Sequence, residues 1–209
     1  MPRDADRTTT YLVAAVVLAI ATIQMLLPDQ VTVGARWLIP AVEVIGVPAA
    51  LVLLQASGAH SRRMRRAVTS YLFFLVMASV LNASLLFVSM LRGEDNDGAT
   101  LLFGGFGVLT INVLSFGLVY WWTDAGGPGA RAHGEPHELD FQFPQQASGM
   151  KWTPQLPDYL FTAYTNIIAF SPTDTMPLSH RAKFLFTVQS TVSLVTILVT
   201  VSHAINLIN

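Results

Sequence analysis

The residues from Ser171 to Thr175 form a short polar turn that could do chemistry on an ion pathway. The turn reads Ser-Pro-Thr-Asp-Thr, so four of its five side chains carry oxygen atoms. In an oligomer, Asp174 would be repeated around the axis as a ring of carboxylates, and such rings attract hydrated cations. Alternatively, Asp174 caps a turn, and Ser171, Pro172 and Thr173 form the bend between two helices. A third interpretation is a loop that binds a partner or closes a gate.

Glu43 is the only acidic residue inside the long apolar segments of the sequence. An unpaired charge at membrane depth costs roughly 2.5–3.5 kcal/mol on insertion scales, and such residues often serve ion or proton pathways. Pro40, Gly46 and Pro48 flank Glu43 and predict a kinked helix with freed carbonyl groups nearby. Glu43 is therefore a candidate ion or proton site, and the other interpretation is a protonated or hydrogen-bonded side chain that orients helices.

Four further polar side chains at membrane depth are candidates for a site. They are Asn166, Gln189, His203 and Asn206. Hydrogen bonding between helices is the default role of such groups and contributes about 0.6 kcal/mol each on average. His203 and Asn206 lie three residues apart, hence on one helix face, where they either line a vestibule or pack between helices.

The sequence argues against metal, cofactor and enzyme chemistry. It contains no cysteine, which excludes disulfides, thiolate metal sites and a cysteine nucleophile. Residues 133–138 include two histidines and two glutamates, but a glycine and a proline between them prevent a preorganised zinc site. No nucleotide-binding loop, nucleophile elbow or basic stripe for nucleic acid is present. We expect no enzyme activity, no cofactor, no metal and no nucleic-acid partner.

The composition is typical of a membrane protein that crosses the bilayer several times. Of the 209 residues, 52% are hydrophobic and only 12% are charged, whereas about 25% are charged in a soluble domain. Long uncharged runs alternate with short charged ones, and a helix needs about 20 apolar residues to cross the hydrocarbon layer. Five spans are predicted, at Thr10–Leu27, Trp37–Leu54, Ser70–Leu91, Leu101–Trp122 and Phe184–Ile208.

The long connection between the last two spans has two different halves. Residues 124–138 are rich in glycine and proline and predict a flexible surface loop. Further on, Pro157 and Asp158 mark a helix start, because proline suits the first turn and an acidic group suits the positive end of the helix dipole. The segment that follows, 158–168, is too short to cross the bilayer, so we expect a half-membrane helix shielded by protein or by a water cavity.

The distribution of arginine and lysine predicts the orientation. With five spans, the N-terminus, the second loop and the long fourth loop share one side, which carries ten basic residues against two on the other. The ten are Arg3, Arg7, Arg62, Arg63, Arg65, Arg66, Arg131, Lys151, Arg181 and Lys183, and the two are Arg36 and Arg92. By the positive-inside rule, the N-terminus and the long loop are cytoplasmic in a plasma-membrane protein.

The segment from Tyr159 to Lys183 resembles the pore module of tetrameric potassium channels. In that family a threonine-rich pore helix leads into a Thr-Val-Gly-Tyr-Gly-Asp filter, followed by a proline, a hydroxyl residue and a small residue next to a basic one. The matching residues here are Asp174, Pro177, Ser179, Ala182 and Lys183. The chain is also similar to a group of uncharacterised actinobacterial membrane proteins. The resemblance implies an outer helix 101–122, a loop 123–157, a pore-like helix 158–168, a turn 169–179 and an inner helix 184–208.

The filter positions depart from the potassium-channel pattern. They are Ala169, Phe170, Ser171, Pro172 and Thr173, with no glycine among them. Stacked carbonyls that replace an ion's water shell need glycines able to adopt left-handed dihedral angles, and proline fixes its own φ near −65°. We therefore expect no potassium selectivity.

The sequence thus predicts an all-α integral membrane protein with five transmembrane helices, a short re-entrant pore-like helix and a turn. Residues 1–92 would form a peripheral three-helix region, and residues 99–209 the pore-like module. The expected function is that of a channel-like homo-oligomer in the lipid bilayer, with a tetramer favoured and weak selectivity among inorganic cations. The alternatives are a small transporter built on Glu43, or a structural module whose basic residues 62–66 meet anionic lipid.

Potassium-channel pore loops enter from outside the cell, whereas the basic residues place this loop in the cytoplasm. Three explanations remain open. The loop is inverted, as in proteins that resemble glutamate-receptor pores; residues 158–170 span, giving six helices; or the resemblance reflects ancestry only.

Overall fold

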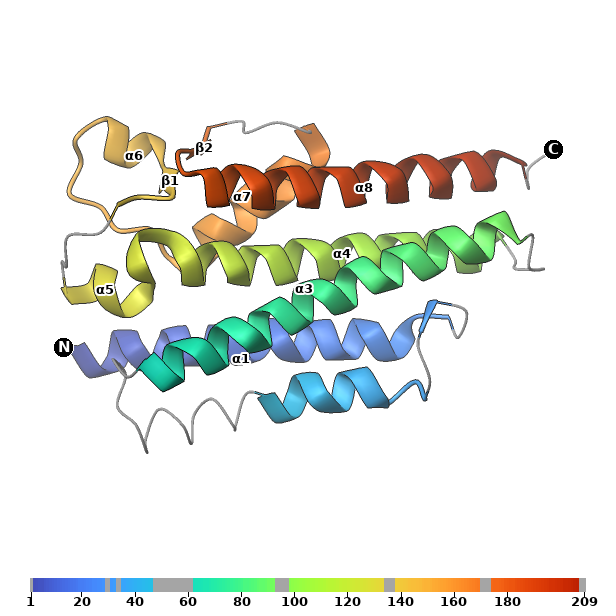
Figure 1. Cartoon of the computed structure of the whole chain (residues 1–209), viewed down its shortest axis with the longest axis horizontal. Coiled ribbons are helices and arrows are strands. Elements are labelled where there is room, and N and C mark those ends of the chain that lie inside the picture. The colour runs from blue at the N-terminus through green and yellow to red at the C-terminus, as the bar shows by residue number, and fades with distance from the viewer. Residues whose placement is uncertain are drawn as a thin grey trace.

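Four long helices lie side by side along the long axis of the molecule (Figure 1). The computed structural model describes residues 2–28, 31–32, 35–46, 62–92, 98–133, 138–169 and 174–206. The long helices are α1 (Pro2–Leu26), α3 (Arg62–Leu91), α4 (Gly98–Thr123) and α8 (His180–Asn206). Residues 38–46 are also helical.

Each of the four long helices is long and apolar enough to cross a membrane. The candidate spans among the described residues are Thr9–Leu26, Arg63–Leu91, Leu102–Gly126 and His180–Ser202. They correspond to the first, third, fourth and fifth predicted spans. Of the second predicted span, Trp37–Leu54, residues 47–54 lie outside the described part of the chain.

The shorter elements gather at one end of the bundle. A 3₁₀ turn, Asp124–Gly126, follows α4 and leads into α5 (Pro128–His133). Then come β1 (Phe141–Gln142), α6 (Pro144–Ala147), α7 (Leu156–Ala169) and β2 (Met176–Pro177). The two strands pair antiparallel, with Phe141 opposite Pro177 and Gln142 opposite Met176. This short pairing is not expected from the sequence pattern, because a two-residue strand has no periodicity to detect.

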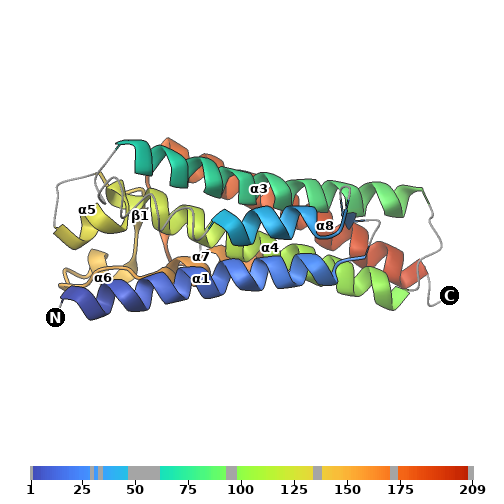
Figure 2. The ribbon, with the colours of Figure 1, turned by 90° about the horizontal axis from the view of Figure 1, so that it is seen from below.

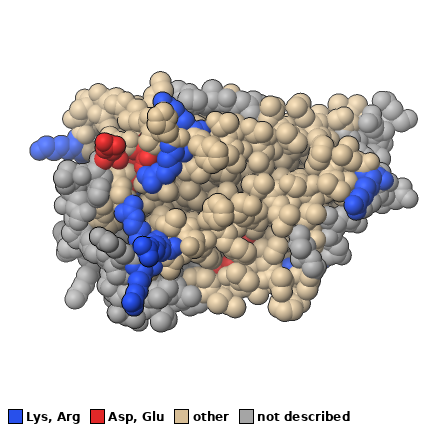
Figure 3. Space-filling view, in the orientation of Figure 1, with Lys and Arg blue, Asp and Glu red and all other residues tan. Residues whose placement is uncertain are grey.

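The two ends of the bundle differ in charge. The N-terminal ends of α1, α3 and α8 lie together with α5, α6 and the strands, while α8 ends at the opposite pole (Figures 1 and 2). Most Lys and Arg side chains visible in Figure 3 lie at the first of these ends, and a broad surface with little visible charge lies beside them. This end of the bundle therefore brings together described parts of the segments that the count of basic residues predicts on one side of a membrane.

The central helix is α4, which packs against α1, α3, α7 and α8. Two glycines of α4 permit close approach of its neighbours. A Cβ on Gly105 would lie 2.6 Å from Thr200 of α8, and one on Gly117 would lie 2.6 Å from Leu160 of α7. Small residues at such crossings let helix backbones approach closely, which is how helices associate within a membrane.

The outer surface of the helices suits an apolar surrounding. Large apolar side chains are exposed along them, including Phe73, Phe103 and Leu198. Exposed hydroxyls bond within their own helix, as Thr22 does by donating to the Leu18 carbonyl at 2.7 Å and Thr110 to the Phe106 carbonyl at 2.8 Å. Such bonds satisfy the hydroxyl without water.

The prediction of a flexible surface loop at residues 124–138 is wrong for its first part. Asp124 is fully buried, Ala125 is buried, and α5 follows directly. Gly126 and Gly127, at φ 79° and 99°, turn the chain back so that α5 lies against the 3₁₀ turn that follows α4. Composition misleads here because glycines that permit a tight, ordered turn look the same in the sequence as those of a loose loop. Residues 134–137 lie outside the described part of the chain.

Candidate functional site

The candidate site is the polar interface between α4, α7 and α8. The start of α7 is stabilised locally by Asp158 in the first turn of the helix. Asp158 Oδ2 accepts a hydrogen bond from the Gln155 backbone N–H at 2.7 Å. The helix runs from Leu156 to Ala169, close to the predicted range of 158–168. Its buried face carries Tyr159, Thr162 and Asn166, and this face lies against α4 and α8.

Gln189 joins all three helices at the centre of this interface. Its Oε1 accepts a hydrogen bond from the Tyr120 hydroxyl of α4 at 2.6 Å and from Asn166 Nδ2 of α7 at 2.8 Å. Its Nε2 donates to the Ala163 carbonyl of α7 at 3.1 Å. Gln189 is fully buried. One amide therefore fixes the position of α7 relative to both long helices.

Asn166 completes this network on α7. Its Oδ1 accepts a hydrogen bond from the Ser190 hydroxyl at 2.9 Å, and its Nδ2 also lies 3.3 Å from the Phe186 carbonyl. Because Gln189 Oε1 already accepts two hydrogen bonds, an ion could bind this oxygen only if one of those bonds broke. The two predicted site residues thus come together, and their geometry is that of a helix clamp.

Asp124 lies at the end of α4, where it forms a second buried network. Its Oδ1 accepts hydrogen bonds from the backbone N–H groups of Asp140 and Phe141 at 2.9 and 3.1 Å. Its Oδ2 accepts one from the Tyr159 hydroxyl at 2.5 Å. A buried carboxylate is tolerated only when its lone pairs are satisfied, so Asp124 holds the start of α7 and the β1 segment against α4.

Two arginines cover the carbonyl end of α4. Arg131 donates to the carbonyls of Trp121 at 2.8 Å and Asp124 at 2.6 Å, and its guanidinium lies 5.2 Å from the centre of the Tyr159 ring. Burial lowers the pKa of Arg131 from its usual value, while the nearby Tyr159 and Asp124 act in the opposite direction. Arg181 donates to the Thr123 carbonyl at 3.0 Å. Cations at this position satisfy free carbonyls and complement the helix dipole.

Asp140 links this end of α4 to the start of α8. Its carboxylate forms an ion pair with Arg181 and accepts a hydrogen bond from the Ser179 hydroxyl at 2.5 Å. Ser179 Oγ also accepts from the Ala182 backbone N–H at 3.1 Å, which is the geometry of a helix N-cap. Ser179 and Ala182, which match the channel pattern in sequence, therefore serve here to begin α8.

Phe141 fills the space between the three helices just beyond Tyr120. Its ring is fully buried, and its centroid lies 5.0 Å from that of Tyr120, 5.6 Å from that of Phe186 and 6.2 Å from that of Tyr159. Such aromatic contacts are stabilising at these distances. The cluster closes this end of the α4–α7–α8 interface within one chain.

Only part of the predicted turn is described. Phe170, Ser171, Pro172 and Thr173 lie outside the described residues. Ala169 is exposed at the end of α7, and Asp174 is exposed after the turn. Thr175 is buried, with its Oγ1 3.2 Å from Thr162 Oγ1.

Comparison with protein-family models, with curated proteins and with solved structures finds no match to this chain.

Glu43 lies apart from this interface, in the helical segment 38–46. Its side chain is 0% exposed, and neither carboxyl oxygen has a hydrogen-bond partner among the described residues. The Tyr71 hydroxyl of α3 donates to its backbone carbonyl at 2.6 Å, and a Cβ on Gly46 would lie 2.0 Å from the Tyr71 ring. The segment is thus packed tightly on α3, with a buried carboxyl group that no described residue satisfies.

Other buried polar side chains pair between helices, and the last two polar candidates predicted from the sequence are not described. Gln24 of α1 and Asn82 of α3 exchange two hydrogen bonds, at 2.8 and 3.2 Å. Ser193 Oγ lies 3.4 Å from Asn112 Oδ1. The side chains of His203 and Asn206 lie outside the described part of the structure. Within the described residues no group of three or more His, Asp or Glu side chains could hold a metal ion.

The sequence interpretation missed Asp124, Tyr120 and Phe141. A signal for Asp124 does exist: an acidic residue directly follows the predicted fourth span and is itself followed by Gly-Gly-Pro-Gly. An acid placed at a helix C-terminus is unfavourable with respect to the dipole, so it needs a specific partner. Nothing comparable marks Phe141 among the other aromatic residues.

Proposed function

We propose that this chain is a channel-like, multi-pass membrane protein whose central unit consists of α4, α7 and α8. The observation that carries the proposal is α7, a short helix whose polar face is held between two candidate spans by Gln189. Its 14 residues reach about 21 Å, less than the roughly 30 Å of the hydrocarbon layer. Both the start of α7 and strand β2 lie at the basic end of the bundle (Figure 1). A start and a return at the same end of the bundle support the proposal that this segment is re-entrant.

The proposed pathway for ions runs between subunits. Within one chain, Phe141 and the Gln189 network fill the α4–α7–α8 interface. A pathway therefore needs the exposed faces of α7 and α8 from several copies, which favours a homo-oligomer and, by the resemblance to pore modules, a tetramer. The exposed face of α8 carries two hydroxyl residues near its start, Thr187 and Thr191.

We propose weak selectivity among cations, without selectivity for potassium. Asp174 is exposed after the turn, where four copies would form a ring of carboxylates that attracts hydrated cations. The residues from 169 to 173 contain no glycine, so a ladder of dehydrating carbonyls cannot form there. The re-entrant segment would enter from the cytoplasmic side of the plasma membrane, because α5, α6 and β2 lie at the bundle end that is rich in arginine (Figure 1).

Planar-bilayer recording of the purified oligomer tests the proposal. We expect a conductance that favours cations over anions, and a smaller preference for cations in Asp174→Asn. Glu138→Gln is the matched control, because Glu138 is also an exposed carboxylate but lies before β1, away from the turn. A demonstrable tetramer that conducts at no voltage or pH would contradict the proposal, and so would an equal effect of both substitutions.

The second candidate function is a small transporter that uses Glu43. The observation that favours it is the fully buried carboxyl group, whose two oxygens have no hydrogen-bond partner among the described residues. Such a group can bind a proton or a small cation. A flux assay in vesicles distinguishes the candidates: Glu43→Gln abolishes flux in a transporter and leaves a channel conducting, whereas Asp174→Asn has the reverse pattern.

A further inference from the structure

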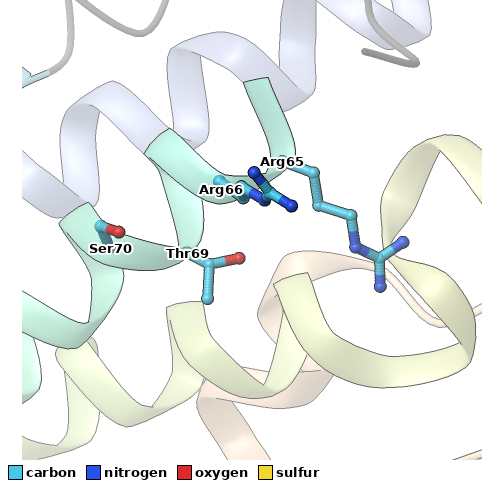
Figure 4. Close-up of a pocket in the computed structure, with 4 residues that line it drawn as sticks. All are labelled: Arg65, Arg66, Thr69 and Ser70. Carbon is cyan, nitrogen blue, oxygen red and sulfur yellow. The ribbon is translucent and has the colours of Figure 1, made fainter. Parts of the chain in front are cut away.

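A hollow in the surface of α3 lies at the basic end of the bundle. It is lined by Arg65, Arg66, Thr69 and Ser70, and it has a volume of about 440 Å³ (Figure 4). All four side chains are exposed and come from the first turns of the helix. Two guanidinium groups and two hydroxyls offer the donors that recognise phosphate oxygens, and guanidinium can do so with two parallel hydrogen bonds.

Neighbouring residues hold two of these side chains in place. Arg65 Nη1 donates to the Gly126 carbonyl at 2.9 Å, and Figure 4 shows the side chain reaching across from α3. Thr69 Oγ1 accepts a hydrogen bond from the Trp122 indole N–H at 3.1 Å. Because Thr69 accepts that bond, its own hydroxyl proton remains available to a ligand. Tryptophan is enriched where the headgroups of a bilayer lie, so the hollow is at a suitable depth for a lipid headgroup.

Within the described residues, no acidic side chain compensates the positive charge of the hollow, because the residues that line it there are two arginines, a threonine and a serine. Arg65 bonds a neutral carbonyl, so its charge persists, and Arg66 forms no hydrogen bond or ion pair with any residue in the described part of the chain. A partner for this site must therefore be anionic.

An apolar path continues from the hollow along the same face of α3. After Ser70, the residues Phe73, Met77 and Leu81 follow at intervals of three, four and four, which places them in one row on the helix. Their side chains are 65%, 47% and 40% exposed. A free phosphate ion has no use for this row, whereas the acyl chain of a lipid would lie along it.

We propose that this hollow binds the phosphate group of an anionic phospholipid, with an acyl chain along Phe73, Met77 and Leu81. The site does not depend on conduction, because it lies on α3, outside the α4–α7–α8 unit.

Native mass spectrometry of the detergent-solubilised protein tests the site, with phosphatidylglycerol and phosphatidylcholine added in turn. We expect retained phosphatidylglycerol, and at least about tenfold weaker retention in Arg66→Gln, since a hydrogen bond between charged groups is lost. Arg63→Gln is the matched control, because Arg63 is an exposed arginine of the same turn that does not line the hollow. It should retain the lipid as the unaltered protein does.

A second variant distinguishes loss of the lipid site from a folding defect. Ser70→Leu fills the hollow without changing the charge, and it should also lose phosphatidylglycerol while keeping the melting temperature of the unaltered protein. Equal losses in Arg63→Gln and Arg66→Gln would overturn the proposal in favour of diffuse attraction. Equal retention of phosphatidylcholine would also overturn it, as would complete competition by inorganic phosphate, which would indicate a site for the free anion.

Discussion

The Tyr159 hydroxyl donates a hydrogen bond of 2.5 Å to the carboxylate of Asp124, thirty-five residues earlier in the chain. Both side chains are 0% exposed. The other carboxylate oxygen of Asp124 accepts two backbone N–H groups from residues 140 and 141. The end of α4 therefore positions both the strand segment before α7 and the first turns of α7. The short helix is set by this bond at its start and by Gln189 further along, rather than by its own length.

Tyr159→Phe should lower the free energy of unfolding by about 1.5–3 kcal/mol, because it leaves a buried carboxylate without one of its three donors. Chemical unfolding in a mixed detergent system, followed by circular dichroism, measures the change. Tyr164→Phe on the same helix is the control, since Tyr164 is 52% exposed and should change stability by less than about 0.5 kcal/mol. Equal effects in the two variants would mean that the bond to Asp124 contributes nothing to stability.

Gly117→Ala should destabilise the α4–α7 contact. The added Cβ would lie 2.6 Å from Leu160 Cδ2 and 3.1 Å from Leu160 Cα, so the backbone of α7 must move. Overpacking of this kind costs about 1–3 kcal/mol. Gly129→Ala in α5 serves as the control, because nothing lies within 4 Å of its added Cβ. Thermal unfolding should show a lower midpoint for the first variant only; an unchanged midpoint for Gly117→Ala would show that α7 moves freely relative to α4.

The four long helices and α7 can be predicted from the sequence because each depends on local composition. An apolar run of membrane length predicts a long helix whatever it packs against, and Asp158 with Pro157 marks the start of α7. Asp124 could not be assigned in this way, because its partners Tyr159 and Phe141 are distant in the sequence. Its glycine-rich surroundings also favour a loop in any local interpretation.

The candidate site was predictable to a similar extent. Asn166 and Gln189 are recognisable as polar groups within apolar helices, and the structure brings them together at 2.8 Å. The choice between binding an ion and holding a helix depends on whether their oxygens are already occupied, which only the three-dimensional arrangement reveals. Glu43 differs from these two amides, since its carboxyl oxygens have no hydrogen-bond partner among the described residues.

Glu43 should react with dicyclohexylcarbodiimide, an apolar reagent that modifies protonated carboxyl groups in membrane interiors. The expectation follows from its complete burial and from the absence of a hydrogen-bond partner for its oxygens among the described residues, since an unpaired charge there is costly and favours the neutral acid. Peptide mass spectrometry should find one adduct on Glu43, and none in Glu43→Gln. A water-soluble carbodiimide should instead modify the exposed Glu138 first. The reverse order of reaction would show that Glu43 is accessible to water and charged.

Cysteine labelling should establish the orientation of the bundle, since the chain has no cysteine of its own. Ser148 is exposed at the end of α6, and the α6 segment shares the bundle end where the N-terminus of α1 lies (Figure 2). The excess of arginine and lysine at that end predicts that it is cytoplasmic. A membrane-impermeant maleimide applied to intact cells should therefore label Asn209→Cys and spare Ser148→Cys, and both should react after the cells are lysed. Labelling of Ser148→Cys alone would mean that the loop faces outward, as it does in potassium channels; labelling of both would exclude an odd number of spans between them.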